Sequence, residues 1–275
     1  MEKILAPSIL AADIMRLGEQ IEAVKNAGAK YLHIDVMDGM FVPALSYGMC
    51  VVESIRKSCD MVLDVHLMIV EPGRHVEAFA KAGADIITIH LEACADAHEV
   101  IRQIHSCGCK AGVSIKPGTP IEVLEEYLDE FELILIMSVE PGFGGQKYIP
   151  ESTERIRQTA ELIRKSGREI ELEVDGGVDG DTCKLCIASG ANVLVAGSAV
   201  YKAADIPAKI KELRGLHLME YFPAPLEKLV EQFARLPGVG YKSAQRLAFY
   251  VLSLPEQEAR AFADAILEAK RSVTL

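Results

Sequence analysis

Histidine and carboxylate side chains lie at the ends of three strand-like stretches of this 275-residue sequence. His33 and Asp35 end the second such stretch, His66 ends the third, and Asp175 follows the seventh. Side chains two residues apart in a strand point to the same side, so His33 and Asp35 share one face. Two imidazoles and two carboxylates suit one divalent transition ion, with Zn²⁺ favoured and Fe²⁺, Mn²⁺ or Co²⁺ also suitable.

This group of side chains suits the transfer of a proton next to a carbonyl. The reaction needs a base on one face of the carbon, an acid on the other, and a charge that stabilises the enediolate oxygens. A metal ion acts there as a Lewis acid, and Asp35 and Asp175 can act as the acid–base pair. A single histidine at a strand end is usually a packing residue, but four such groups at three strand ends favour a functional site.

Glycine-rich loops follow the sixth, seventh and eighth strand-like stretches. Glycines let backbone N–H groups approach an anion closely, so three such loops predict a phosphate grip, although turns need glycine in any case. The predicted contacts are Gly142, Phe143, Gly144, Gly145, Gly176, Gly177, Gly197 and Ser198.

The elements that must position these groups alternate between strand and helix. Eight apolar stretches, from residues 4–9 to residues 192–196, alternate with amphipathic stretches, several of which end at a glycine typical of a helix C-cap. This pattern predicts an α/β fold, a closed (β/α)8 TIM barrel over residues 1–215 with its active site at the C-terminal ends of the strands. A doubly wound open sheet is the alternative, but its Gly-x-Gly-x-x-Gly opening after the first strand is missing.

Charge and composition restrict the classes of partner. The formal net charge is −11, and residues 219–275 contain seven basic and seven acidic residues, so residues 1–218 carry all of it. This argues against a broad nucleic-acid surface on the barrel but allows a small anionic substrate. The seven cysteines, without a secretion signal, predict free thiols in the cytoplasm. We also expect a homo-oligomer and no membrane association.

The sequence of residues 216–275 predicts a small all-α segment, because only helix-like patterns follow residue 224. The stretch Leu236-Pro-Gly-Val-Gly-Tyr-Lys-Ser-Ala-Gln-Arg246 fits a helix-hairpin-helix. Gly238 and Gly240 would expose amides to a DNA phosphate, and Lys242 and Arg246 would add charge, in a sequence-independent contact. A plain helical hairpin with a glycine turn fits the spacing equally well.

Five motifs of the barrel segment together point to a known family. They are His33-Ile-Asp-Val-Met-Asp-Gly-Met-Phe-Val-Pro43, Asp64-Val-His-Leu-Met68, Met137-Ser-Val-Glu-Pro-Gly-Phe-Gly-Gly-Gln146, Val174-Asp-Gly-Gly-Val178 and Ala196-Gly-Ser-Ala-Val200. This set resembles the ribulose-phosphate 3-epimerase family, from Ala6 to about Arg214. The resemblance implies metal-dependent conversion of D-ribulose 5-phosphate to D-xylulose 5-phosphate in the pentose phosphate pathway.

The resemblance also implies roles for the matching residues. The four proposed metal ligands and the acid–base pair would keep their roles, and the glycine-rich loops would hold the substrate phosphate. Further substrate contacts would be made by Ser8, Met37, His66, Met68 and Met137. Without the resemblance, these methionines would be interpreted as core filler.

Two departures from the family pattern bear on the substrate. Ala44 stands where family members often carry Asn after Phe-Val-Pro, and Glu140 stands where Asn is common before Pro-Gly. A hexulose-phosphate 3-epimerase, such as the allulose 6-phosphate enzyme, is the alternative, although Gly-Phe-Gly-Gly and Asp-Gly-Gly-Val favour the pentulose enzyme. The Asp-x-Lys-x-x-Asp run of related barrel decarboxylases is absent from the sequence.

The C-terminal segment has a resemblance of its own. Residues 219–275 are similar to the N-terminal region of the recombination mediator RecR, including Tyr221, Pro225 and Lys270-Arg271. That family continues with a zinc finger and a Toprim domain, whereas this sequence stops before the first zinc cysteine. We therefore expect an end-to-end fusion whose tail has little independent function and binds DNA weakly at best.

Overall fold

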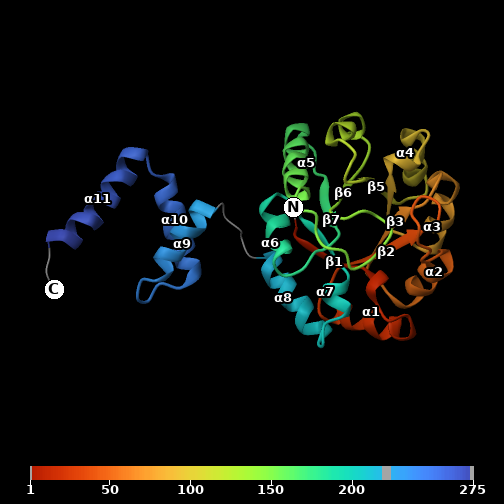
Figure 1. Ribbon diagram of the computed structural model, residues 1–275, viewed down its shortest axis with the longest axis horizontal. Coiled ribbons are helices and arrows are strands. Elements are labelled where there is room, and N and C mark those ends of the chain that lie inside the picture. The colour runs from red at the N-terminus through yellow and green to blue at the C-terminus, as the bar shows by residue number, and fades with distance from the viewer. Residues whose placement is uncertain (1, 219–223, 273–275) are drawn as a thin grey trace. The chain divides into compact units, whose positions relative to one another are not determined.

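The computed structural model describes residues 2–218 and 224–272. The chain divides into two compact units, Met1–Glu220 and Tyr221–Leu275. The first unit is an eight-stranded parallel barrel surrounded by helices, and the second is helical (Figure 1). The expected TIM barrel followed by a helical segment is thus confirmed.

The strands follow one another around the barrel in the order β1-β8-β7-β6-β5-β4-β3-β2, and all their pairings are parallel. A parallel bridge between Ser8 and His33 joins the end of β1 to β2 and closes the sheet. The strands are β1 (Ile4–Pro7), β2 (Tyr31–Met37), β3 (Val62–Met68), β4 (Ile86–His90), β5 (Lys110–Ile115), β6 (Leu133–Met137), β7 (Glu171–Asp175) and β8 (Val193–Ala196).

Helices cover the outside of the barrel (Figure 1). The α-helices of this unit are α1 (Leu17–Asn26), α2 (Met49–Ser58), α3 (Val76–Ala82), α4 (Ala97–Ser106), α5 (Ser152–Ser166), α6 (Thr182–Ala188), α7 (Ser198–Tyr201) and α8 (Ile206–Leu218). Short 3₁₀ helices are η1 (Ile9–Ala11), η2 (Ile14–Arg16), η3 (Pro72–Arg74), η4 (Leu91–Ala93) and η5 (Ile121–Tyr127).

We expected an α-helix in every crossover, and the connection between β5 and β6 differs from this expectation. It is made by η5, a 3₁₀ helix preceded by Pro120. Its buried residues, Ile121 and Leu124, are three positions apart, which matches the three residues per turn of a 3₁₀ helix. After β8, the last strand, the chain continues in two helices, α7 and α8.

Burial on both faces explains why the strands are nearly continuous apolar runs. All five residues of β6 are buried. Helix α3 directs Val76, Phe79 and Ala82 inward at helical spacing and ends at Gly83, whose φ is 108°. A Cβ at Gly83 would lie 2.4 Å from Cγ of Arg56, so both backbone conformation and space require glycine there.

The second unit has a small core of its own. Helices α9 (Ala224–Ala234) and α10 (Tyr241–Ser253) pack on each other through Leu226, Val230, Ala244 and Ala248. Nearly all described side chains of α11 (Glu256–Ser272) are exposed. Within the described residues, the structure contains no helix that is long and apolar enough to cross a membrane.

The packing of α3 can be tested by removing a ring. Phe79 is 2% exposed, so Phe79→Ala leaves a cavity and should lower the free energy of unfolding by about 3–5 kcal/mol, measured by urea denaturation followed by circular dichroism. Val123→Ala in η5, where 37% of the residue is exposed, should cost less than about 1 kcal/mol. Equal losses for the two variants would contradict the packing described.

Candidate metal and acid–base site

Polar side chains enter the barrel in pairs from β2, β3 and β7. The members of each pair are two residues apart: His33 and Asp35, Asp64 and His66, Glu173 and Asp175. The parallel register of β2 and β3 pairs His33 with Asp64 and Asp35 with His66. Each strand therefore supplies one residue to a deep level and one to a level nearer the barrel mouth.

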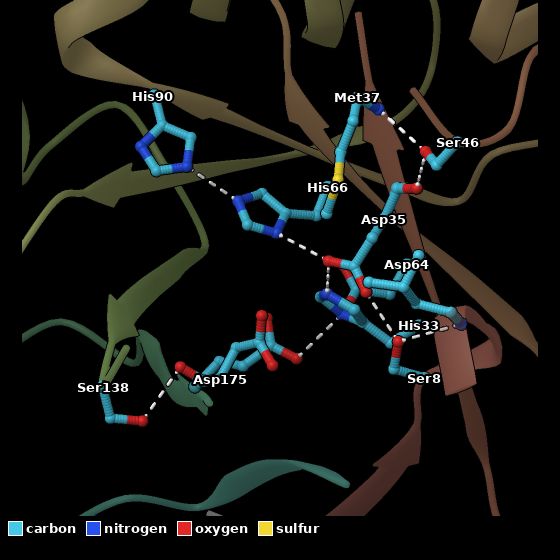
Figure 2. A network of polar contacts seen from close by, with 12 residues as sticks. Ser8, His33, Asp35, Met37, Ser46, Asp64, His66, His90, Ser138 and Asp175 are labelled. Carbon is cyan, nitrogen blue, oxygen red and sulfur yellow. Dashed lines mark hydrogen bonds and ion pairs between the residues drawn. The ribbon is translucent and has the colours of Figure 1, made fainter. Parts of the chain in front are cut away.

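The four sequence-predicted metal ligands lie together at these levels (Figure 2). His33 Nε2 and His66 Nδ1 lie 3.3 Å and 3.2 Å from the same atom, Asp35 Oδ1. One ligand atom from each of these residues and from Asp175 can be chosen so that all lie within 4.8 Å of one another. The described structure thus brings two imidazoles and two carboxylates to one point, as predicted.

The orientation of the His33 ring is set by two carboxyl groups deep in the barrel, those of Asp64 and Glu173. His33 Nδ1 lies 2.6 Å from Asp64 Oδ2 and 3.6 Å from Glu173 Oε1. Its Nε2 is buried and has no hydrogen-bond partner among the described residues. A ring nitrogen held by a carboxylate fixes the tautomer and leaves the other nitrogen available to a metal. This nitrogen, which makes no hydrogen bond and has the 3.3 Å ion-pair contact with Asp35 Oδ1, and the mixed imidazole–carboxylate donor set fit a divalent ion.

The electrostatic field at this position favours a cation. Burial lowers the pKa of His33, but the charges of Asp64 and Asp35 outweigh burial and place the pKa well above its ordinary value. Burial and the charge of Asp64 raise the pKa of Glu173 well above its ordinary value, which favours the neutral form of that carboxyl. The field that favours a proton on His33 also favours a metal ion.

The two carboxylates nearest the barrel mouth have different pKa values. Burial raises the pKa of Asp35, but His33 and His66 outweigh burial and hold it well below its usual range. Burial and the charge of Asp35 raise the pKa of Asp175 to about 7. Near neutral pH one carboxyl is therefore ionised and the other is partly protonated, which suits a base and an acid.

Hydrogen bonds hold the Asp35 carboxylate and the backbone of both Asp35 and Asp175 in place (Figure 2). Ser8 Oγ donates to Asp35 Oδ2 at 2.6 Å, and Ser46 Oγ donates to the Asp35 carbonyl at 2.6 Å. The backbone of Asp175 is held by Ser138, whose N–H donates to the Asp175 carbonyl at 2.8 Å and whose hydroxyl lies 2.9 Å from it.

A cavity of about 830 Å³ opens at the C-terminal ends of the strands. Most of the sequence-predicted site residues line it: Ser8, Asp35, Met37, Met68, Met137, Gly142, Phe143, Gly144, Gly145, Asp175, Gly176, Gly177, Gly197 and Ser198. His66, a predicted substrate contact, is fully buried and is not among the lining residues. The structure therefore places the acid–base pair and the predicted phosphate loops in one space.

The loop after β7 needs its glycines for structural reasons as well. Gly177 has a φ of 63°, and a Cβ there would lie 2.3 Å from the backbone nitrogen of Tyr148. The loops after β6 and β7 can approach this closely only because Gly177 has no side chain. Their contact with a phosphate stays a prediction.

Two polar residues next to the ligands, Asp64 and Glu173, were missed at the sequence level. Asp64, Glu173 and His90 are fully buried, and His66 Nε2 lies 2.9 Å from His90 Nε2. Burial lowers the pKa of His90 to about 4, so this ring is neutral. The two-residue repeat of a β-strand could have identified Asp64 and Glu173. Asp64 precedes His66 by two residues and Glu173 precedes Asp175 by two, so each lies on the same face of its strand as a ligand.

The predicted DNA contacts lie in the second unit. Gly238, with a φ of 79°, lies in the turn between α9 and α10, and Gly240 is the N-cap of α10. Arg246 is exposed on α10. The side chain of Lys242 lies outside the part of the chain that the structure describes, as do Met219 and Tyr221.

Comparisons with known proteins agree with the two units. Residues 4–201 match the Ribulose-phosphate 3 epimerase family, and residues 226–270 match the family described as RecR, helix-hairpin-helix. Ribulose-phosphate 3-epimerase of Bacillus subtilis is 49% identical over 212 residues, which cover 77% of this chain and 98% of that protein. The chloroplastic enzyme of Arabidopsis thaliana is 47% identical over 213 residues, 77% of this chain and 76% of its own.

Solved structures at low identity support the fold alone. KGPDC from Streptococcus mutans has a TM-score of 0.61 at 15% identity, covering 79% of this chain and 98% of its own. A 3-hexulose-6-phosphate synthase has a TM-score of 0.56 at 21% identity, covering 78% and 99%. The family assignment rests on the curated relatives and on the family match over residues 4–201. They show that the chain belongs to the ribulose-phosphate 3-epimerase family.

Proposed function

We propose that the barrel interconverts D-ribulose 5-phosphate and D-xylulose 5-phosphate by inverting C3 through an enediolate, as a step of the pentose phosphate pathway. The observation that carries this proposal is the pair Asp35 and Asp175. The two side chains come from β2 and β7, line one cavity and have pKa values displaced in opposite directions. The names of the curated relatives support the choice of substrate.

Asp35 and Asp175 divide the proton transfer between them. The ionised carboxylate removes the C3 proton from one face, and the protonated carboxyl delivers a proton to the other face, so the configuration inverts. Their roles exchange in the reverse direction. Ser8, whose hydroxyl donates to Asp35 Oδ2 at 2.6 Å, keeps that carboxylate oriented toward the reacting carbon.

His33, Asp35, His66 and Asp175 would hold one divalent ion, with Zn²⁺ favoured and Fe²⁺, Mn²⁺ or Co²⁺ as alternatives. When bound, the ion supplies positive charge that stabilises the enediolate oxygens. Asp64 orients His33 for this role through the 2.6 Å contact with its Nδ1.

The remaining lining residues bind and enclose the substrate. The backbone of the loops after β6, β7 and β8 would hold the phosphate. Met37, Met68 and Met137 are buried beside the two carboxylates and would exclude water from the reacting carbon. A cavity of about 830 Å³ is within the usual size range for a small-molecule site.

Replacing either carboxylate should abolish most of the turnover. Asp35→Asn and Asp175→Asn should each lower kcat about 10²–10⁴-fold, because the amide can neither remove nor deliver the proton. A coupled assay on D-ribulose 5-phosphate measures this loss, and metal analysis should show part of the metal retained. Asp60→Asn, an exposed partner of Lys25, is the matched control and should be fully active. Activity within tenfold of wild type in either site variant would contradict the assignment.

Metal removal and substrate choice test the rest of the proposal. Chelation should remove epimerase activity, and Zn²⁺ or Fe²⁺ should restore it, with metal content followed by mass spectrometry. The loaded enzyme should prefer D-ribulose 5-phosphate to D-allulose 6-phosphate in parallel assays. A metal-loaded protein that acts only on the hexulose phosphate would support the metal site and show that the substrate assignment is wrong. Full activity without metal would overturn the metal site.

For the second unit, we propose at most a weak, sequence-independent contact with DNA. The supporting observations are the helix-hairpin-helix match, the glycine turn before α10 and the exposed Arg246. The equal numbers of acidic and basic residues after position 218 limit the affinity.

Fluorescence anisotropy of the full chain with labelled duplex DNA tests this limit. Binding should be no tighter than the micromolar range at physiological salt, about 10⁻⁴–10⁻⁶ M, and should weaken further as salt rises. Arg246→Ala should weaken it and leave epimerase activity intact. Nanomolar binding would show that the unit is an independent DNA-binding module.

A further inference from the structure

A line of side chains leads from the ligand cluster to the partly exposed Glu92. Figure 2 shows its inner part, from Asp35 through His66 to His90. His66 Nδ1 faces Asp35 Oδ1 at 3.2 Å, and His66 Nε2 lies 2.9 Å from His90 Nε2. The other nitrogen of His90, Nδ1, has no hydrogen-bond partner among the described residues but lies 3.4 Å from Glu92 Oε2, within ion-pair distance. His66 and His90 are stacked with ring centroids 5.0 Å apart, and neither is exposed, whereas the Glu92 side chain is 23% exposed.

The proton positions along this line depend on one another. A neutral imidazole carries one N–H, so of the two facing Nε2 atoms one must donate and the other accept. An ionised carboxylate only accepts, so Glu92 favours the His90 proton on Nδ1. His90 Nε2 is then the acceptor, and His66 must carry its own proton on Nε2. The lone pair of His66 is left on Nδ1, the atom that faces the ligand cluster.

The opposite arrangement is disfavoured at the outer end, where it would direct the lone pair of His90 Nδ1 at the carboxylate of Glu92, so two acceptors would face each other. At the inner end it would let His66 Nδ1–H donate to Asp35 Oδ1 at 3.2 Å, so Asp35 and Glu92 favour opposite proton orders. A metal would have to displace a proton on His66 Nδ1, so metal binding requires the order that Glu92 favours. Only the first arrangement satisfies the outer carboxylate and leaves the inner nitrogen bare.

Glu92 is held so that one oxygen remains for His90. Its other oxygen, Oε1, accepts from the Lys116 N–H at 2.7 Å and from the Thr119 hydroxyl. Arg155 donates to the carbonyls of Thr119 and Lys116 at 2.8 Å and 3.1 Å, which fixes the same loop. Burial raises the pKa of Glu92, but the neighbouring His90 and the hydrogen bonds from Thr119 and Lys116 outweigh burial and lower the pKa to about 2, so the carboxylate is charged.

We propose that Glu92 and His90 are positioning residues that place the proton of His66 on Nε2 and so prepare its Nδ1 as a metal ligand. The inference rests on the metal site of the proposed function. It gives the two ligand histidines equivalent support, since His33 is held directly by Asp64 and His66 is held by Glu92 through His90.

Glu92→Gln exchanges the acceptor that faces His90 for a donor. The glutamine oxygen can keep the bonds to Lys116 and Thr119, while its NH₂ faces His90 Nδ1 and reverses the proton order. The full-length apoprotein is titrated with Zn²⁺ against a chromophoric chelator. We expect the Zn²⁺ affinity to fall about 10–100-fold, with the thermal unfolding of the apoprotein unchanged. Glu125→Gln, an exposed glutamate of η5, should bind within twofold of wild type.

A double-mutant cycle shows whether Glu92 acts through His90. His90→Phe keeps an aromatic ring against Phe41, 4.9 Å away by centroids, and removes both nitrogens. His90→Phe alone should lower Zn²⁺ affinity about 10–100-fold. Adding Glu92→Gln to it should change the affinity by no more than about threefold, because the route is already broken. Additive losses would show that Glu92 does not act on His66 through His90.

The wild-type protein provides a test that needs no variant to fold. In Zn²⁺-loaded, ¹⁵N-histidine-labelled protein, long-range ¹H–¹⁵N spectra should show His90 protonated on Nδ1 and His66 on Nε2. A His90 proton on Nε2, or Zn²⁺ affinity unchanged by Glu92→Gln, would show that Glu92 and His90 do not position His66. Neither result would count against the metal site itself. A wild-type protein that binds no Zn²⁺ would overturn both.

Discussion

Charged groups buried at the centre of the barrel must be paired, and this constraint organises the site. An unpaired buried charge is strongly destabilising, whereas a paired and hydrogen-bonded charge can be tolerated. His33 is therefore held by Asp64 at 2.6 Å, and Asp35 by Ser8 at 2.6 Å. Glu173 lies 3.6 Å from His33 Nδ1, which Asp64 already holds, and burial and the charge of Asp64 raise the pKa of Glu173 and favour its neutral form. These contacts leave His33 Nε2 and the outer carboxylates directed at one point.

The positions of these groups follow from the geometry of parallel strands. A period of two sends both members of each pair into the barrel, and the register of β2 and β3 puts Asp35 beside His66. Closure of the sheet then brings β7 and its Asp175 to the same cluster. The loops at this end supply the cavity wall, so the barrel positions the two carboxylates of the proposed acid–base pair while the loops form the wall of the proposed substrate site.

The sequence was sufficient to predict the barrel and the four clustered residues, because strand number, strand ends and side-chain period can be read locally. It was not sufficient for contacts that depend on packing between strands. His90 ends β4 like an ordinary core residue, and only the structure shows its Nε2 2.9 Å from that of His66. The crossover through η5 was also missed, since buried Ile121 and Leu124 satisfy a 3₁₀ turn as well as the start of an α-helix. Glu173 was missed because a glutamate is rarely expected to be fully buried.

We propose that two carboxyl groups on opposite faces of one carbon invert its configuration. Epimerisation of D-ribulose 5-phosphate in D₂O, with deuterium at C3 of substrate and product followed by NMR early in the reaction, tests this mechanism. We expect each newly formed D-xylulose 5-phosphate to carry solvent deuterium at C3, because the acid that delivers the proton is not the base that removed it. Product that retains the original hydrogen at C3 would contradict a two-carboxylate mechanism.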